Sequence, residues 1–318
     1  MSCASNPNFA YKNAMHLIHF ISIPFYLIIV TVLLKIHSKI FETYKCYLIW
    51  HILLNMLTEF HNSYLMLPVV HLPFPVLRVT GILGEQGFSG LFCFYVLSIC
   101  IMQTGSSVLE MLYFRYKASI LNYEERKFSV FLKAFVFTYR LIIIIIPILI
   151  TITFTRTVEE QEKYKLEMVK TTPSLSPEIL CYTVLVAPPF SNLVMICTLL
   201  VWSALITITF TIIPITTIYL NSYFHENHNL SEAVIRLQKM LLMSLIVQSI
   251  IHGVMLGVPN IMFIYGITMG ADSEAVAYIT IICVTFHGFS STIALMCFTK
   301  PIRTGILDLF RFKKQLSQ

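Results

Sequence analysis

Seven long apolar segments constrain the fold of this chain more than any other feature of its sequence. They cover residues 14–34, 44–68, 88–113, 134–154, 192–220, 239–265 and 275–298. An α-helix rises about 1.5 Å per residue, so about 20 apolar residues are enough to cross the hydrocarbon core of a bilayer. Only helices and closed barrels satisfy their backbone polar groups within lipid. The pattern therefore predicts an all-α membrane protein, a single domain over residues 1–318 in which seven transmembrane helices form a bundle.

The amino-acid composition agrees with this prediction. Of the 318 residues, 57% are hydrophobic and only 12% are charged, whereas soluble domains average about 45–50% and about 25%. A water-soluble fold of this chain would expose large apolar patches, so lipid is the better solvent for its surface. The net charge of +6 comes from basic residues spread over the loops. No basic stripe is present, and nucleic acid is therefore not an expected partner.

The distribution of basic residues predicts an orientation. If the N-terminus lies outside, 15 Lys and Arg residues fall in the inner segments and 6 in the outer ones. Since basic residues near span ends collect on the cytoplasmic side, the N-terminus is expected outside and the tail 299–318 inside. Residues 304–314 alternate apolar and basic side chains and predict a short amphipathic helix on the inner membrane surface. The glycosylation pattern Asn229-Leu230-Ser231 lies on a predicted inner loop, so we expect it to be unused.

Several ionisable residues lie inside the predicted spans, where a charge costs about 2.5–3.5 kcal/mol on insertion scales. Similar depths along the helices predict a polar contact between Glu59 and His287, and an ion pair between Glu110 and Arg140. Two alternatives stay open. Arg140 could extend to the membrane surface by itself, and Glu59 could be neutral and hydrogen-bonded. Further histidines in the spans are His51, His61 and His252.

The eight cysteines form no Cys-x-x-Cys pair, which leaves zinc and thioredoxin-like sites without support. Cys181 is the only cysteine of the long outer loop 155–189, and Cys93 lies near the outer end of the third span. A disulfide between Cys93 and Cys181 is therefore predicted, with two free thiols as the alternative. The sequence has no nucleophile elbow, phosphate loop or metalloprotease motif, so neither an enzyme nor a bound cofactor or metal is expected.

A ligand of such a bundle would bind between the helices from the outer side. Polar and aromatic candidates for contacting it are Tyr95, Gln103, Asn260, Tyr265 and Tyr278, although each could equally be a packing residue.

The predicted inner surface is basic and contains Arg115, Tyr116, Arg236, Lys239 and Arg303. These residues could contact an acidic protein partner or simply anionic membrane lipid. Arg115 closes the third span, where it could hold the inner ends of the helices together. The alternative for Arg115 is an ordinary basic flank.

Four stretches of the chain resemble the nematode serpentine chemoreceptors of the Str superfamily, particularly class H and class I. The first two are Leu57-Thr58-Glu59-Phe60-His61 followed by Leu65-Met66-Leu67-Pro68, Pro73 and Pro75, and then Tyr113-Phe114-Arg115. The third contains Ser231, Leu237-Gln238, Ser244-Leu245 and Gln248-Ser249-Ile250-Ile251-His252. The fourth and most specific is His287-Gly288-Phe289-Ser290-Ser291-Thr292 followed by Met296 and Pro301-Ile302-Arg303. The chain departs from the family pattern at three places: the acid before Arg115 is lost in Tyr113-Phe114, and His252 and Ile302 replace a proline and a tyrosine.

The resemblance implies a rhodopsin-like, G-protein-coupled chemosensory receptor for a small environmental chemical. It also implies a heterotrimeric G protein as partner, and a place in the plasma membrane or the ciliary membrane of sensory neurons. Two other functions stay open from the residues alone. One is a ligand-gated channel or transporter, although the spans offer few polar residues to line a path. The other is a seven-helix protein without a ligand, used in assembly or trafficking.

Overall fold

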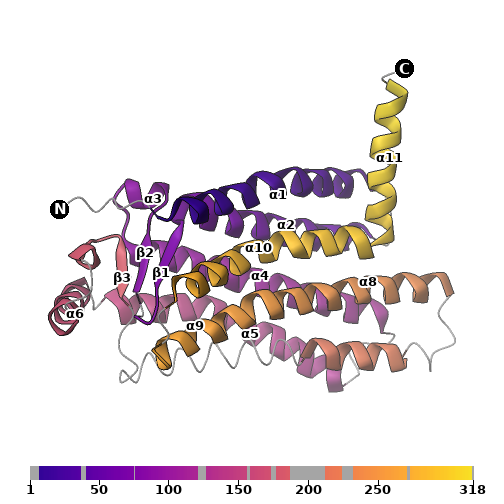
Figure 1. Cartoon of the computed structure of the whole chain (residues 1–318). Coiled ribbons are helices and arrows are strands. Elements are labelled where there is room, and N and C mark those ends of the chain that lie inside the picture. The colour runs from indigo at the N-terminus through magenta and orange to yellow at the C-terminus, as the bar shows by residue number, and fades with distance from the viewer. Residues whose placement is uncertain are drawn as a thin grey trace.

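The computed structural model describes residues 7–36, 41–74, 76–120, 127–155, 158–172, 177–186, 212–223, 232–270 and 273–316. Over these residues the chain is mostly helical, and the long helices lie side by side along one direction (Figure 1). Their bounds are α1 Phe9–Lys35, α2 Glu42–Phe60, α4 Gly90–Ser119, α5 Lys127–Thr155, a helix over 212–223, α8 Glu232–His252, α9 Val258–Thr268 and α10 Glu274–Phe298. The helical bundle agrees with the predicted fold class.

Four helical segments of the described residues are long and apolar enough to cross a membrane: α1, α4, residues 238–269 and α10. Of the other predicted spans, 134–154 lies within α5, and 44–68 is helical as far as Met66 but ends at Pro68, where β1 begins. The span 192–220 lies outside the described residues except for 212–220, and so does Asn229-Leu230-Ser231. The exact limits of seven spans and their orientation stay predictions.

Two of the long helices contain a π-helical turn. α2 continues into η1, His61–Met66, and α8 continues through η4, Gly253–Gly257, into α9. A π-turn inserts an extra residue into the helix and often lies at a functional site. Pro259 follows directly after the second turn. α9 is thus joined to α8 by a distorted turn rather than by regular helix.

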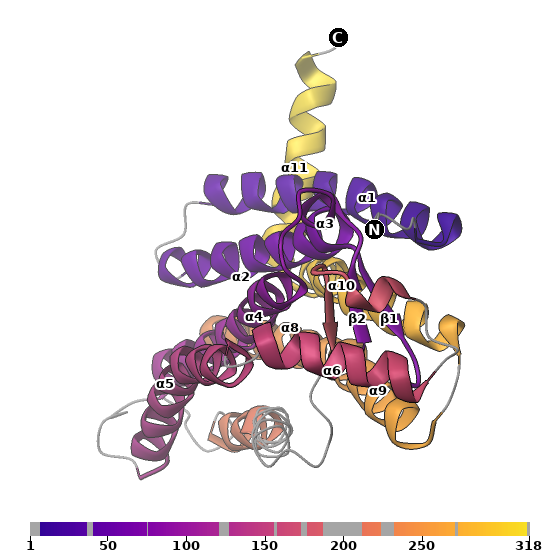
Figure 2. The ribbon, with the colours of Figure 1, turned by 90° about the vertical axis from the view of Figure 1, so that its left-hand side faces the viewer.

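A small antiparallel sheet covers one end of the bundle (Figures 1 and 2). Its strands are β1 Pro68–His71, β2 Val76–Val79 and β3 Val184–Val186, in the order β1-β2-β3. Because side chains alternate along a strand, one face of the sheet presents apolar residues to clusters shared with the helices. These residues are Val70, Leu77, Val79 and Leu185. By the predicted orientation this is the outer end of the bundle.

The sheet, α6 Val158–Thr171 and η3 Pro177–Leu180 together form what we call the outer lid. Several polar contacts hold it in place. The Tyr11 hydroxyl on α1 donates to the carbonyl of Pro68 at 2.6 Å, and Arg78 pairs with Glu178 at 2.6 Å. The Gln161 amide on α6 both donates to and accepts from the backbone of Val186. The lid is therefore tied to α1, and α6 is tied to the sheet.

The predicted Cys93–Cys181 disulfide is wrong. Cys93 is a free, buried thiol, packed with Met66, Val79 and Leu97 on the side of the sheet that faces the bundle. Cys181 is disulfide-bonded, but it packs with residues of the opposite face, among them Val184. The two sulfurs thus lie on different faces of the sheet, and the partner of Cys181 lies outside the described residues.

The lid contacts α9 at a glycine. A Cβ atom added at Gly266 would lie 2.9 Å from the Leu72 side chain, which packs with Phe263 and Ile267 of α9. We therefore expect Gly266→Ala to displace the methyl groups of Leu72 and to destabilise the protein by about 1 kcal/mol, because the overpacking cost of about 1–3 kcal/mol is partly offset by the gain of about 1 kcal/mol from replacing glycine in a helix. Thermal unfolding of the detergent-purified protein measures this loss.

Two further variants control the Gly266 prediction. Gly257 lies in the same helical segment and has no atom within 4 Å of an added Cβ, so Gly257→Ala should not destabilise the protein. Leu72→Ala alone removes a buried side chain, and combining it with Gly266→Ala should cost less than the sum of the two single losses, because the clash is absent in the double variant. A Gly266→Ala protein as stable as Gly257→Ala would show that Leu72 does not occupy this position.

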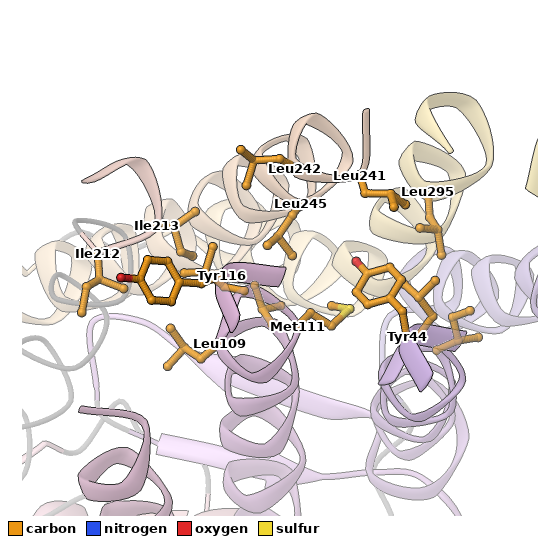
Figure 3. Close-up of a cluster of buried hydrophobic side chains, with 14 of the residues drawn as sticks. Tyr44, Leu109, Met111, Tyr116, Ile212, Ile213, Leu241, Leu242, Leu245 and Leu295 are labelled. Carbon is orange, nitrogen blue, oxygen red and sulfur yellow. The ribbon is translucent and has the colours of Figure 1, made fainter. Parts of the chain in front are cut away.

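The largest apolar cluster extends from Leu185 of β3 along the helices of the bundle, and Figure 3 shows part of it. Tyr44, Met111, Tyr116 and Leu245 are all buried there, and they come from α2, α4 and α8. The cluster holds these helices together close to the inner ends predicted from the sequence.

The C-terminal helix α11, Lys300–Leu316, contains the predicted segment 304–314 and crosses the direction of the bundle (Figure 1). Its Gly305 backbone lies so close to α1 that an added Cβ would be 2.6 Å from Val32. The helix itself is thus as expected, and its contact with the membrane surface stays a prediction.

Candidate functional site

Buried polar side chains collect at three levels of the bundle. One group surrounds Glu59 between α1 and α2, and a second surrounds three histidines on α2, α8 and α10. The third surrounds Arg115 at the inner end of α4. Polar side chains inside a membrane bundle are costly, so they commonly mark functional sites or specific helix contacts.

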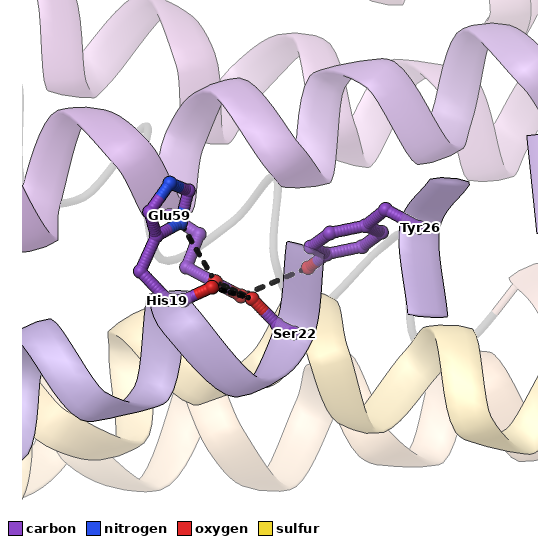
Figure 4. A network of polar contacts seen from close by, with 4 residues as sticks. All are labelled: His19, Ser22, Tyr26 and Glu59. Atoms are coloured by element: carbon purple, nitrogen blue, oxygen red, sulfur yellow. Dashed lines mark hydrogen bonds and ion pairs between the residues drawn. The ribbon is translucent and has the colours of Figure 1, made fainter. Parts of the chain in front are cut away.

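The Glu59 group is a complete hydrogen-bond network (Figure 4). Glu59 is fully buried. His19 Nδ1 lies 3.1 Å from Glu59 Oε1, and the Ser22 hydroxyl contacts the same oxygen. The Tyr26 hydroxyl donates to Glu59 Oε2 at 2.9 Å. Three side chains of α1, spaced three and four residues apart on one face of the helix, thus hold one carboxylate of α2.

The predicted contact between Glu59 and His287 is therefore wrong. Glu59 lies at a suitable depth, but its carboxylate turns to α1 rather than to α10. His287 Nδ1 instead contacts the carbonyl of Val284, and its Nε2 has no hydrogen-bond partner. Depth along the bundle fixes the height of a side chain but not the neighbour that it faces.

The second group, which we call the histidine centre, consists of His51, His252 and His287. The ring centroids of His51 and His252 are 5.4 Å apart, and those of His252 and His287 are 5.2 Å apart. His51 Nδ1 lies 2.7 Å from the Ser107 hydroxyl, and Asn55 Nδ2 lies 3.0 Å from His51 Nε2. The centre thus joins α2, α4, α8 and α10.

The close approach of α10 to α2 explains part of the family-like motif that begins at His287. A Cβ added at Gly288 would lie 2.9 Å from Asn55 Cβ and 3.0 Å from the Tyr26 hydroxyl oxygen. Ser291, one turn further along, reaches His51 Nε2 at 3.3 Å. The glycine permits the helix contact, and the serine makes the hydrogen bond across it.

The third group holds Arg115, which is only 2% exposed. Its guanidinium carbon lies 3.3 Å from the ring centroid of Tyr44 on α2. Its Nη1 donates to Gln238 Oε1 on α8 at 3.3 Å. Arg115 therefore bridges the inner ends of α2, α4 and α8, and we call these three residues the inner latch. No carboxylate takes part in the latch.

The other residues of the predicted inner surface lie outside the latch. Tyr116 is buried, and its hydroxyl is 3.1 Å from that of Ser129. Arg236, Lys239 and Arg303 are exposed. The exposed basic side chains are positioned to contact an acidic partner or anionic lipid, and a role in G-protein contact stays a prediction for all of them.

The predicted pair between Glu110 and Arg140 is present in the structure. Arg140 Nε on α5 lies 2.8 Å from Glu110 Oε1 on α4. The Arg140 side chain is about half exposed, at 51%. The pair joins α4 to α5 on the periphery of the bundle, away from the histidine centre and the latch.

The five predicted ligand contacts do not form one cluster. Asn260 donates within its own helix to the carbonyl of Leu256, and Tyr265 is exposed. Tyr278 stacks on Tyr11 with the ring centroids 4.5 Å apart. Tyr95 and Gln103 are partly buried on α4. A ligand-contact role for any of the five remains a prediction.

A buried lysine in the outer lid predicts a pH dependence. Lys165 donates to the carbonyl of Cys181 at 2.8 Å, and burial lowers the pKa of Lys165 to about 8, with a smaller opposing effect of Glu162. Between about pH 8 and about pH 10.5 the unfolded lid keeps a proton that the folded lid has lost, so stability should rise with pH across this window. Hydrogen exchange of residues 158–186, normalised for intrinsic rates, should slow accordingly.

The matched variants for this pH effect are Lys165→Met and Lys163→Met. The first should abolish the pH dependence, and the second, at an exposed position of the same helix, should preserve it. Equal pH responses in both variants would show that another group titrates.

Sequence reasoning missed most partners of these groups. None of His19, Ser22 and Tyr26 is a predicted site residue, although they occupy one face of α1. Gln238 belongs to a family-like stretch, but it is not predicted as a partner of Arg115. The signal that could have identified the three residues of α1 is the helical spacing of polar residues within the first apolar segment. Among the described residues, no group of three or more His, Cys, Asp or Glu side chains is arranged to hold a metal ion.

Comparison with known proteins gives one family. Residues 6–312 match the family model described as "Serpentine type 7TM GPCR chemoreceptor Srh". No curated protein matches the chain. The match covers nearly the whole chain, including α1, most of α11 and all three buried polar groups.

Proposed function

This chain belongs to the Srh family of serpentine seven-transmembrane chemoreceptors of the GPCR type, and on that premise we propose that it detects a small environmental chemical and activates a heterotrimeric G protein. The family consists of membrane receptors and not of enzymes. The ligand, the G protein and the membrane in which the receptor works are parts of our proposal. We place it in the plasma membrane or the ciliary membrane of sensory neurons, with the N-terminus outside.

The inner latch is the observation that carries this proposal. A receptor needs two arrangements of its helices, and a ligand shifts the balance only if it binds one of them more tightly. Arg115 is held by Tyr44 and Gln238, which come from two other helices. Separation of α8 from α4 would break the contact to Gln238 and leave Arg115 available to a partner at the inner surface. The latch is thus a defined contact that distinguishes a resting arrangement from an active one.

The ligand would act from the opposite end of the bundle. The outer lid packs on α9 through Leu72 and Gly266 and on α10 through Ala277. α9 continues through the π-turn η4 into α8, which contains Gln238. A ligand that changes the position of α9 or the lid therefore has a continuous helical segment through which to affect the latch. We retain Tyr95, Gln103 and Tyr278 as the first positions to test for ligand contact.

A reporter assay tests the function. The receptor would be expressed in cells with a G-protein reporter and exposed to a panel of odorants and small metabolites. We expect a response to at least one compound, and we expect it to disappear when the G protein is deleted. A ligand-gated current that persists in cells lacking G proteins would instead identify a channel. Epitope tags at the two termini should lie on opposite faces of the membrane.

A further inference from the structure

Several buried polar atoms in the histidine centre and on the neighbouring residues Asn55 and Gln248 have no hydrogen-bond partner. They are Asn55 Oδ1, Gln248 Oε1 and Nε2, His252 Nε2 and His287 Nε2. The four residues are at most 5% exposed and come from α2, α8 and α10. Elsewhere in the same bundle the polar side chains of the Glu59 group are hydrogen-bonded to one another. Other buried polar atoms without a partner lie at Asn62, Ser63 and Arg115, but only here do three helices contribute them beside a pair of histidine rings in contact, among the described residues.

The partners of the ring Nδ1 atoms fix the chemistry of these histidines. His252 Nδ1 lies 2.7 Å from the carbonyl of Gln248, and His287 Nδ1 contacts the carbonyl of Val284. A carbonyl oxygen only accepts hydrogen bonds, so both Nδ1 atoms carry the proton. In a neutral ring the other nitrogen, Nε2, is then an acceptor. Both unpartnered Nε2 atoms therefore present lone pairs.

His51 has the same tautomer but is fully partnered. The Ser107 hydroxyl donates to the carbonyl of Thr104 at 2.6 Å, so it accepts from His51 Nδ1–H. His51 Nε2 accepts from Asn55 Nδ2 at 3.0 Å and shares its lone pair with the Ser291 hydroxyl at 3.3 Å, which leaves Asn55 Oδ1 as another acceptor without a donor. The unpartnered set is consequently rich in acceptors, and the Gln248 amide is its one donor group among those named here.

Energetics favour an occupant at this position. A buried polar atom without a partner costs about 1–3 kcal/mol, and native proteins retain few of them. Buried water typically makes about three hydrogen bonds to such groups. The occupant must donate hydrogen bonds to several acceptors. A cation is less suitable, because no carboxylate belongs to the centre and no metal-binding group of three His, Cys, Asp or Glu residues occurs in the described residues.

The unpartnered groups of α8 lie beside its π-helical turn. His252 is the last residue of α8, and the π-turn η4 begins at the next residue. Gln248 lies one turn before it on the same helix. The unpartnered groups therefore lie directly before the distorted turn that separates α8 from α9.

We propose that the histidine centre is a binding site for small hydroxyl donors. In the receptor without ligand the site is occupied by water, and this water bridges α8 to α2 and α10. Each water has two O–H groups, so the site needs two water molecules. Together they donate to His252 Nε2, His287 Nε2, Asn55 Oδ1 and Gln248 Oε1, and one of them accepts from Gln248 Nε2. This site is independent of the proposed chemosensory function, because it requires neither a ligand nor a G protein.

Nitrogen NMR of the purified receptor tests the proposal directly. Histidine labelled with ¹⁵N would be incorporated and no small molecule added, with His252→Phe and His287→Phe used to assign the signals. We expect both Nε2 signals to show the shift of a lone pair that accepts a hydrogen bond, and to receive magnetisation from water protons. Signals of bare lone pairs without transfer from water would overturn the proposal. Signals that move only when Zn²⁺ or Na⁺ is added would also overturn it, in favour of a cation site.

Thermal unfolding gives an independent test, because the proposal and its alternative predict that one substitution shifts the melting temperature in opposite directions. Gln248→Met removes the amide and keeps a side chain of similar length. If water bonds to the amide, the variant should unfold about 2 °C or more below the wild type. If the amide is unpartnered, the variant should unfold at a higher temperature, which would contradict the proposal. Ile250→Leu, at an exposed position of α8, is the matched control and should leave the melting temperature unchanged.

Discussion

Replacing Glu59 by leucine is expected to destabilise the receptor by about 3–5 kcal/mol, the range for removing one partner of a buried polar or ionic pair. Glu59 is the only acceptor that the described contacts show for the Tyr26 hydroxyl and for His19 Nδ1. Without the carboxylate, both groups remain buried: His19 Nδ1 loses its described partner, and the Tyr26 hydroxyl keeps, among the described contacts, only the side chain of Thr292. Thermal unfolding in detergent and the amount of receptor at the cell surface should both fall sharply.

Three comparisons separate this effect from a general defect of α2. Glu59→Gln keeps one acceptor oxygen and should lose less stability than Glu59→Leu. Glu42→Gln changes an exposed carboxylate of the same helix and should be nearly neutral. Combining His19→Phe with Glu59→Leu should cost less than the sum of the two single losses, because both remove the same contact. An additive result would mean that His19 and Glu59 do not interact.

The sequence predicts where the helices of this protein form better than it predicts which helices contact one another. A run of about 20 apolar residues determines that a helix forms and how deep each residue lies in a membrane. This was sufficient for Glu110 and Arg140, which lie at similar depths on consecutive helices. It was insufficient for Glu59, because α1 and α10 both approach α2 at that depth. The choice between them depends on helix rotation, which the apolar pattern hardly specifies when most faces are apolar.

The outer lid was not predicted, for a different reason. β1 and β2 are four residues each, and β3 pairs with β2 across about a hundred residues of chain. Such short strands have little periodicity of their own, and their pairing depends on the loops that bring them together. The predicted disulfide is wrong because the sheet was not foreseen: its two faces separate Cys93 from Cys181. A motif match was more informative here, because Gly288 and Ser291 of the fourth stretch both act in the contact of α10 with α2.

Loss of the Gln238 side-chain amide is expected to raise signalling in the absence of ligand. In Gln238→Leu, Arg115 loses its hydrogen bond to α8 but keeps the Tyr44 ring. A hydrogen bond to a charged group contributes about 1.5–3 kcal/mol. If that contact exists only in the resting arrangement, its removal shifts the balance toward the active arrangement by about tenfold or more. The measurement is ligand-independent output of the G-protein reporter, normalised to the amount of receptor at the cell surface.

The opposite substitution gives the stronger test of the latch. Gln238→Glu places a carboxylate beside the guanidinium, and a charge-assisted hydrogen bond is about twice as strong as a neutral one. Basal signalling should therefore fall below that of the wild type, while Met243→Leu, at an exposed position of α8, should leave it unchanged. If Gln238→Leu and Gln238→Glu change basal signalling in the same direction, position 238 acts through helix stability or partner contact. Arg115 would then be a structural arginine rather than the contact that separates the two states.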